Sequence, residues 1–227
     1  MAQSVNIIRL TTHQIREYIN NPRKHYELRQ NKALFFQLCS SLDVVGDTEE
    51  AIVAFENKEF GESIAAHYLA VYGFLQAIYV QQDAVDCLCE SLSIPERINR
   101  YPNLLEIRYI RNDTVGHPTK RDKPKSKPAT FNFISRLTKH MNFTLVSFSG
   151  DGNSKTRKIN IPEIIVEQRK YIAEILSTIV ASLEAEEKAH KDLFRMEKLS
   201  IIFSNSLIYN FEKIFEAYIE KNIQNLQ

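Results

Sequence analysis

Two long segments, 61–92 and 162–195, carry apolar side chains at the spacing of an α-helix, and they constrain the fold more than any other feature. An isoleucine, leucine, valine or tyrosine returns at intervals of three, four or seven residues, which places an apolar stripe along each predicted helix. Helices with such stripes bury them by packing nearly parallel to other long helices. The stripes consist of Ile64, Tyr68, Val71, Leu75, Ile78, Val85 and Leu92 in the first segment, and of Ile161, Ile165, Ile172, Ile175, Ile179 and Leu183 in the second.

Shorter helices are expected on either side of these segments. The 227 residues include 6 glycines and 7 prolines, and this scarcity favours helices over a turn-rich β architecture. Thr12 is a suitable N-cap for a helix over 12–20, and Gly46-Asp47 predicts a break after a helix over 23–42. Further helices are predicted over 47–57, 102–115 and 197–223.

The segment 129–161 has a different pattern. Aromatic and branched residues occur there in short β-type runs, and Gly150-Asp151-Gly152-Asn153 is a hairpin turn signal. We therefore predict a mainly α fold, a multi-helix up-down bundle with a small antiparallel β insertion of two or three strands at about 129–161. The chain is expected to form a single domain over 1–227, comprising an N-terminal helical extension (1–58), a bundle core (61–118 and 162–195), the insertion and a C-terminal helix (197–223).

The candidate functional residues lie at the end of the predicted helix over 102–115, in Arg111-Asn112-Asp113-Thr114-Val115-Gly116-His117-Pro118. In a regular helix Arg111 and His117 would not share a face, because six residues correspond to a rotation of about 240°. Gly116 is expected to end the helix through a left-handed conformation, which would allow His117 to approach Arg111.

These residue types suit the cleavage of RNA without a metal ion. The 2′-OH of RNA attacks the adjacent phosphate, and an enzyme must move protons and stabilise a highly charged phosphorus centre. Histidine transfers protons near neutral pH, and a helix C-terminus favours the protonated imidazole. Arginine offers a fork of donors to phosphate oxygens. A single histidine performs half of the acid–base work, and a second copy in a symmetric dimer would complete the pair.

At these residues the chain resembles the HEPN superfamily, helical-bundle domains found in many RNA-cutting toxins and defence nucleases. The signature of that superfamily is an arginine followed after four to six residues by a histidine, and Arg111-Asn112 with His117 has this form. The resemblance implies a metal-independent endoribonuclease with a site composed across a homodimer, in a bacterial toxin or phage-defence role, with an antitoxin or other inhibitory protein as a possible partner. By carry-over, Arg111 binds phosphate, His117 is the acid/base and Asn112 orients its neighbours.

Two alternatives remain open at this point. An arginine and a histidine near a helix end also occur as a plain surface charge and a C-cap contact. Some HEPN domains, moreover, are non-catalytic modules that bind RNA or a protein partner. Catalysis requires Arg111 and His117 to be exposed together, whereas a binding module is expected to bury His117 or bond it to the backbone.

A basic loop follows the motif. Its cations would hold the RNA backbone, or they would form a solvated, flexible surface loop. Because the net charge of the chain is only +1, any binding of a polyanion depends on such a local patch. The candidate RNA-binding residues of the loop are Lys120, Arg121, Lys123, Lys125 and Lys127. Three aromatic residues follow the loop, namely Phe131, Phe133 and Phe143. They could stack on RNA bases, but packing against the bundle is the favoured interpretation.

No cofactor or metal site is predicted. The chain has no phosphate-binding P-loop, no G-x-G-x-x-G and no G-x-S-x-G, and its histidines form no metal-binding pattern. The residues from Met1 to Leu10 lack the basic start and apolar core of a signal peptide, and no apolar run approaches the ~18 residues of a membrane span. We therefore expect no membrane association and a cytoplasmic location.

Overall fold

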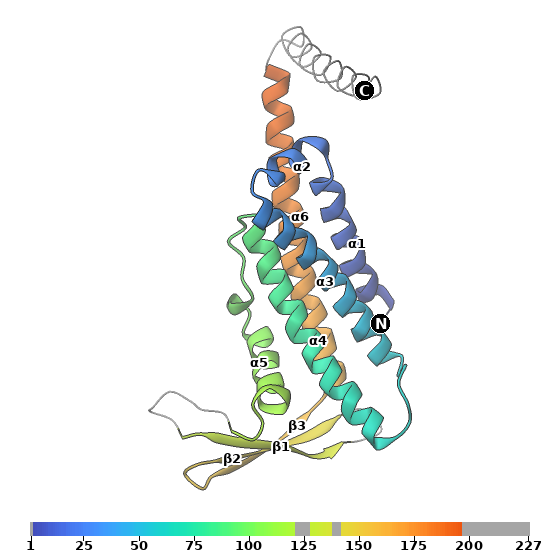
Figure 1. Cartoon of the computed structure of the whole chain (residues 1–227), viewed down its shortest axis with the longest axis vertical. Helices are drawn as coiled ribbons and strands as arrows, with labels where there is room; N and C mark the ends of the chain where they lie inside the picture. Colours follow the sequence, from blue (N-terminus) through green and yellow to red (C-terminus); the bar gives the residue numbers. More distant parts are fainter. Residues whose placement is uncertain (1, 121–127, 138–141, 197–227) are drawn as a thin grey trace, which may run out of the picture. The chain divides into compact units, whose positions relative to one another are not determined.

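The computed structural model describes residues 2–120, 128–137 and 142–196, and it confirms a mainly α fold with a small β insertion (Figure 1). The contacts divide the chain into two units, Met1–Val180 and Ala181–Gln227. The helical bundle and the sheet belong to the first unit. Of the second unit, the structure describes residues 181–196, which are the C-terminal part of α6. The predicted helix over 197–223 lies outside the described residues.

The helices follow the apolar patterning more closely than the local break signals. They are α1 (Ala2–Ile19), α2 (Pro22–Arg29), α3 (Lys32–Glu56), α4 (Ile64–Ser91), α5 (Pro102–Arg111) and α6 (Ile161–Met196), with a short 3-10 helix η1 (Ile98–Arg100) and a π-helical turn η2 (Asn112–Gly116). Figure 1 shows α1, α3, α4 and the first part of α6 side by side, with α5 beside α4.

Two predictions about the N-terminal helices are wrong. Helix α3 continues through Gly46, because Leu42, Val45 and Ile52 are fully buried on both sides of it and their packing outweighs the ~1 kcal/mol helical cost of a glycine. Thr12 does not begin a helix. It lies inside α1, where its hydroxyl donates to the carbonyl oxygens of Ile8 and Arg9.

The predicted β insertion is a three-stranded antiparallel sheet in the order β1 (Thr130–Leu137), β2 (Phe143–Ser149) and β3 (Ser154–Ile159). Phe131 pairs with Phe148, and Phe143 pairs with Ile159. The predicted turn between β2 and β3 uses Gly152 with φ of +89°, a conformation that favours glycine. The sheet lies at the end of the bundle where α5 ends and α6 begins (Figure 1).

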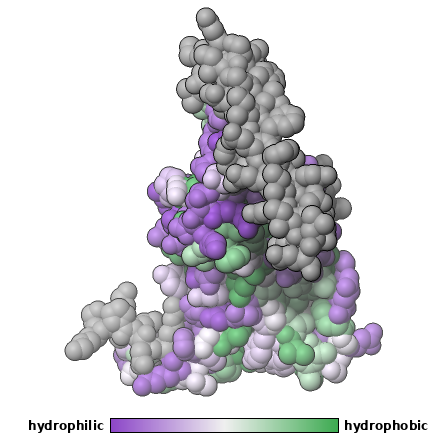
Figure 2. Space-filling model, turned by 45° about the horizontal axis from the view of Figure 1, so that its top comes forward, coloured by the Kyte–Doolittle hydropathy of each residue, from purple (hydrophilic) through white to green (hydrophobic). Residues whose placement is uncertain are grey.

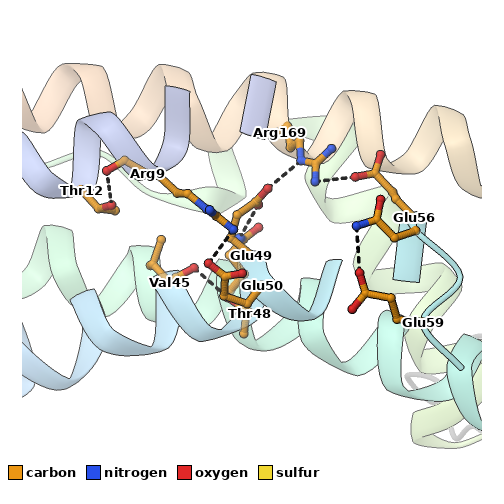
Figure 3. A network of polar contacts seen from close by, with 11 residues as sticks. Arg9, Thr12, Val45, Thr48, Glu49, Glu50, Glu56, Glu59 and Arg169 are labelled. Atoms are coloured by element: carbon orange, nitrogen blue, oxygen red, sulfur yellow. Dashed lines mark hydrogen bonds and ion pairs between the residues drawn. The ribbon is translucent and has the colours of Figure 1, made fainter. Parts of the chain in front are cut away.

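A buried polar network crosses the otherwise apolar centre of the bundle (Figure 3). The Nε of Arg169 on α6 donates to Glu49 on α3 at 2.8 Å, and its Nη2 lies 2.7 Å from Glu56. Glu49 also accepts from Gln81 on α4. Burial raises the pKa of the Glu49 carboxyl above its usual value, while Arg169 and Gln81 favour the charged form.

The neighbouring Gln168 extends this network. Its amide donates to Gln81 at 2.9 Å and to the carbonyl of Ile78, and it accepts from Gln82 at 2.7 Å. All of these side chains are buried, and each bond joins α6 to α4. Because a buried polar group is costly without its partner, these directional bonds favour one register of α6 against α3 and α4.

We expect Glu49→Gln to lower the free energy of unfolding by about 1–3 kcal/mol, because it removes the fully buried one of the two carboxylates that compensate the Arg169 charge and leaves Glu56 as the other. Urea denaturation of the full chain measures this. Glu50→Gln, at the next residue, is the matched control. The ion pair of Glu50 with Arg9 is exposed and contributes about 0–1 kcal/mol. Equal losses in the two variants would contradict a central role for the buried pair.

Candidate functional site

The Arg111–His117 motif begins at the last residue of α5 and passes through the π-helical turn η2. Leu104, Ile107 and Ile110 bury the inner side of α5, which fixes the direction in which Arg111 leaves the helix. The backbone N–H of His117 donates to the carbonyl of Asn112 at 2.9 Å, a bond across five residues. Such wide turns occur often at functional sites. The wide turn brings the chain back toward the end of α5.

The expected role of Gly116 is wrong in its physical reason. The left-handed glycine described in the structure is Gly152, and Gly116 keeps a helical conformation. A Cβ at Gly116 would lie 2.7 Å from Nη1 of Arg111 and 3.2 Å from Oδ1 of Asn112. Glycine is therefore needed here for the close approach of the guanidinium. That approach brings Arg111 to the residue before His117.

Helix α4 and Asn112 hold the Arg111 side chain in place. Oδ1 of Asn112 accepts from Nη1 of Arg111 at 2.9 Å, and Oε1 of Gln76 accepts from Nε at 3.1 Å and from Nη2 at 2.6 Å. The guanidinium carbon lies 4.2 Å from the centre of the Tyr79 ring. These contacts use three of the five N–H donors of a guanidinium and leave two for a ligand.

The partners of Arg111 are all uncharged. The neighbouring Arg108 also lies over Tyr79, at 4.1 Å, but its charge is paired with Asp83 at 2.7 Å. Within the described part of the chain, Arg111 has no carboxylate partner. A half-buried guanidinium held by neutral acceptors has a fixed orientation and a positive charge that none of these acceptors compensates, which suits the binding of phosphate.

His117 is exposed, and the described residues provide no hydrogen-bond partner for its imidazole. Lys120 is exposed as well, whereas Arg121, Lys123, Lys125 and Lys127 lie outside the described residues. The motif thus presents an ordered arginine, an amide that orients it and a histidine open to solvent. Asn112 contacts Arg111 with its side chain, and it contacts His117 through its backbone carbonyl only.

Sequence reasoning missed Gln76 and Tyr79, although a signal was present. Tyr72, Gln76, Tyr79 and Asp83 recur every three or four residues along α4, beside the apolar stripe. Polar and aromatic residues at this spacing form a second stripe on the helix. The structure places α5 against it, because α4 contacts both α5 and η2.

Two buried polar groups adjoin the motif. Thr114 lies within η2, and Asn132 on β1 donates its backbone N–H to the carbonyl of Pro118 at 2.6 Å. Both side chains are at least nine-tenths buried, and the hydroxyl of Thr114 and the amide of Asn132 have no hydrogen-bond partner among the described residues.

A pocket of about 230 Å³ lies nearby, between α5, β3 and the start of α6. Its lining includes the carboxylates of Glu106, Glu163 and Glu167 and the cations Arg157 and Lys158, of which Arg157 is paired with Glu106. None of the motif residues Arg111 to His117 lines it. Its carboxylates outnumber its cations by one, which is unfavourable for phosphate, so the phosphate path is expected to run over the exposed side of the motif.

The residues that the structure describes include no group of three or more histidine, cysteine, aspartate or glutamate side chains arranged to hold a metal ion. No described helix is both long and apolar enough to cross a membrane. No protein-family model matches the chain, and the comparisons with curated proteins and with solved structures found no match either.

We expect Gly116→Ala to displace the Arg111 guanidinium while changing the free energy of unfolding by no more than about 1 kcal/mol, because the added methyl group meets a flexible side-chain end and alanine favours the helix. Modification of arginine by phenylglyoxal, followed by mass spectrometry, should then proceed several-fold faster at Arg111. Arg108 is the internal reference. Gly73→Ala, on α4 with no atom near the added carbon, is the control variant. Unchanged reactivity of Arg111 would contradict the tight approach.

Proposed function

We propose that the chain is a metal-independent endoribonuclease of the HEPN type that cleaves RNA by transesterification at its own 2′-OH. The observation that carries the proposal is the Arg111 guanidinium, which is oriented by Gln76, Asn112 and Tyr79 without a carboxylate partner in the described residues. The exposed imidazole of His117, at the end of the same turn, supports it. A binding module would be expected to bury that histidine or bond it to the backbone.

In the proposed reaction, the 2′-oxygen attacks the adjacent phosphorus and loses its proton, and the 5′-oxygen leaves and gains one. The products are a 2′,3′-cyclic phosphate and a free 5′-OH. Arg111 stabilises the charge on the non-bridging oxygens with its two remaining donors. His117 transfers one of the two protons. Asn112 keeps the guanidinium aimed.

The second proton transfer is assigned to His117 of a second copy in a homodimer. Apolar surface for such a contact lies next to the motif. Tyr72 is one turn before Gln76 on α4, and it is 40% exposed, while the neighbouring Leu69 is 75% exposed. Figure 2 shows that hydrophobic side chains also reach the surface among hydrophilic ones on the face drawn there. A symmetric contact near the motif would bring two copies of the site together.

The biological role that follows is that of a toxin or phage-defence effector acting on cytoplasmic RNA, with an inhibitory protein as a further candidate partner. The alternative is a non-catalytic helical module that uses the same charged site to bind RNA or a protein. The two differ in whether a phosphodiester bond is broken, which the following experiment measures.

We expect the wild-type chain to cut a mixed RNA pool in the presence of EDTA and to leave 2′,3′-cyclic or 3′-phosphate ends. His117→Ala and Arg111→Ala should each lower the rate at least about 100-fold without a comparable loss of stability, because acid–base and charge-stabilising groups contribute that much. His13→Ala, which changes an exposed histidine on α1, is the control. An active His117→Ala variant would remove the assignment of His117, and strict metal dependence would remove the mechanism.

The composite site makes a second, quantitative prediction. When wild-type and His117→Ala chains exchange subunits at equal amounts, the activity should fall to about one quarter if each site needs a histidine from both copies. Independent sites would retain about one half. Activity measured at several mixing ratios distinguishes the quadratic from the linear dependence, and a linear result would exclude the shared site.

A further inference from the structure

The sheet exposes three phenylalanine side chains on one face. Phe131, Phe133 and Phe148 are 39%, 49% and 45% exposed. Phe131 and Phe148 are directly paired across β1 and β2, and the rings of Phe133 and Phe148 stack with their centres 6.0 Å apart and 24° between their planes. Together they form an aromatic platform on neighbouring strands, which we call the phenylalanine platform.

The phenylalanine platform is not part of the core. Side chains alternate between the two faces of a strand, and the buried side chains of the sheet lie at the intervening positions. Asn132, Phe143, Leu145 and Ile159 are all less than 7% exposed on the opposite face. The favoured packing interpretation is therefore correct for Phe143 and wrong for Phe131 and Phe133. A group of aromatic rings left in solvent on one face points to a binding surface.

The charge around the platform favours a polyanion. In the described residues 128–137 and 142–160, the one acidic residue is Asp151, at the tip of the hairpin, whereas Lys155 and Lys158 on β3 are exposed cations. Lys158 is paired with Thr144 and alternates onto the same face as Phe148. Stacking rings beside cations are the combination that binds single-stranded nucleic acid.

The platform also adjoins the Arg111–His117 motif. The backbone of Asn132 is bonded to Pro118, the residue after His117, and Phe131 and Phe133 are its immediate neighbours on β1. A strand rises about 3.3 Å per residue, so both rings start within one residue of the motif's backbone contact. The strand that carries two of the three rings is therefore bonded directly to the end of the motif.

We propose that the phenylalanine platform binds RNA by stacking unpaired bases, and so directs the motif to single-stranded RNA. Every base has a π-face, so such a surface selects unpaired over paired RNA without reading a sequence. The inference rests on the proposed function in taking RNA as the ligand. It adds the binding surface and the structural class of the substrate.

The test is fluorescence anisotropy with a labelled 2′-O-methyl oligouridine, which lacks the attacking hydroxyl and cannot be cut. Phe133→Ala and the Phe131→Ala/Phe133→Ala double variant should raise Kd by about 5- to 150-fold for each stacked base that is lost. Phe133→Leu, which keeps apolar area without a π-face, should lose most of the affinity too. Phe36→Ala changes a ring on α3 that is even more exposed, at 65%, and should leave Kd unchanged.

An abasic oligomer of the same length and charge separates stacking from charge. It should bind wild type as weakly as the double variant binds the uridine oligomer, and a hairpin duplex should compete poorly. Equal Kd values for wild type and the phenylalanine variants would overturn the proposal. The proposal would also be overturned if sedimentation showed that the same variants no longer form dimers, because the face would then belong to a contact between two copies. Because no cutting is measured, failure of the ribonuclease proposal is seen separately in the His117→Ala experiment.

Discussion

The register of the bundle depends on the buried ion pair between Arg169 and Glu49. Apolar stripes alone would allow α6 to slide by a turn against α3 and α4 at modest cost, since the side chains are similar in size and non-directional. A buried guanidinium and a buried carboxylate, by contrast, can pair with each other in one register only. Gln168, next to Arg169, adds directional bonds to α4 in the same layer. Because α6 begins two residues after β3 ends, its position in turn fixes the end of β3.

The candidate site at Arg111 has the opposite arrangement of charge. Glu49 and Glu56 neutralise Arg169 in the core, and Asp83 neutralises Arg108 at the edge of α4, but the acceptors around Arg111 are amides. The same residue type therefore has two uses in one bundle. Carboxylates compensate the charges of Arg169 and Arg108, whereas the amides around Arg111 orient its guanidinium without compensating its charge. Gly116 makes room for this arginine, and the π-turn returns the chain toward it.

Much of the fold could be predicted because apolar periodicity reports burial directly. The stripes of α4 and α6, the hairpin turn at Gly152 and the position of the β insertion all followed from local pattern. The break at Gly46 was wrong, because a glycine's local cost is small beside the packing of Leu42, Val45 and Ile52. Arg111, Asn112 and His117 could be singled out as a motif. Their geometry could not, because a π-turn has no clear sequence signal.

The sequence by itself determined which residues are apolar at which spacing, and hence the helices, the sheet and the presence of an arginine–histidine motif at a helix end. Only the tertiary structure decided what surrounds that motif. Gln76 and Tyr79 lie over thirty positions away along the chain, and α4 brings them to Arg111 through contacts between distant segments. The exposure of Phe131 and Phe133 was likewise decided there. Alternation along β1 predicts two faces, and the tertiary structure buries Asn132 on one of them while Phe131 and Phe133 stay exposed on the other.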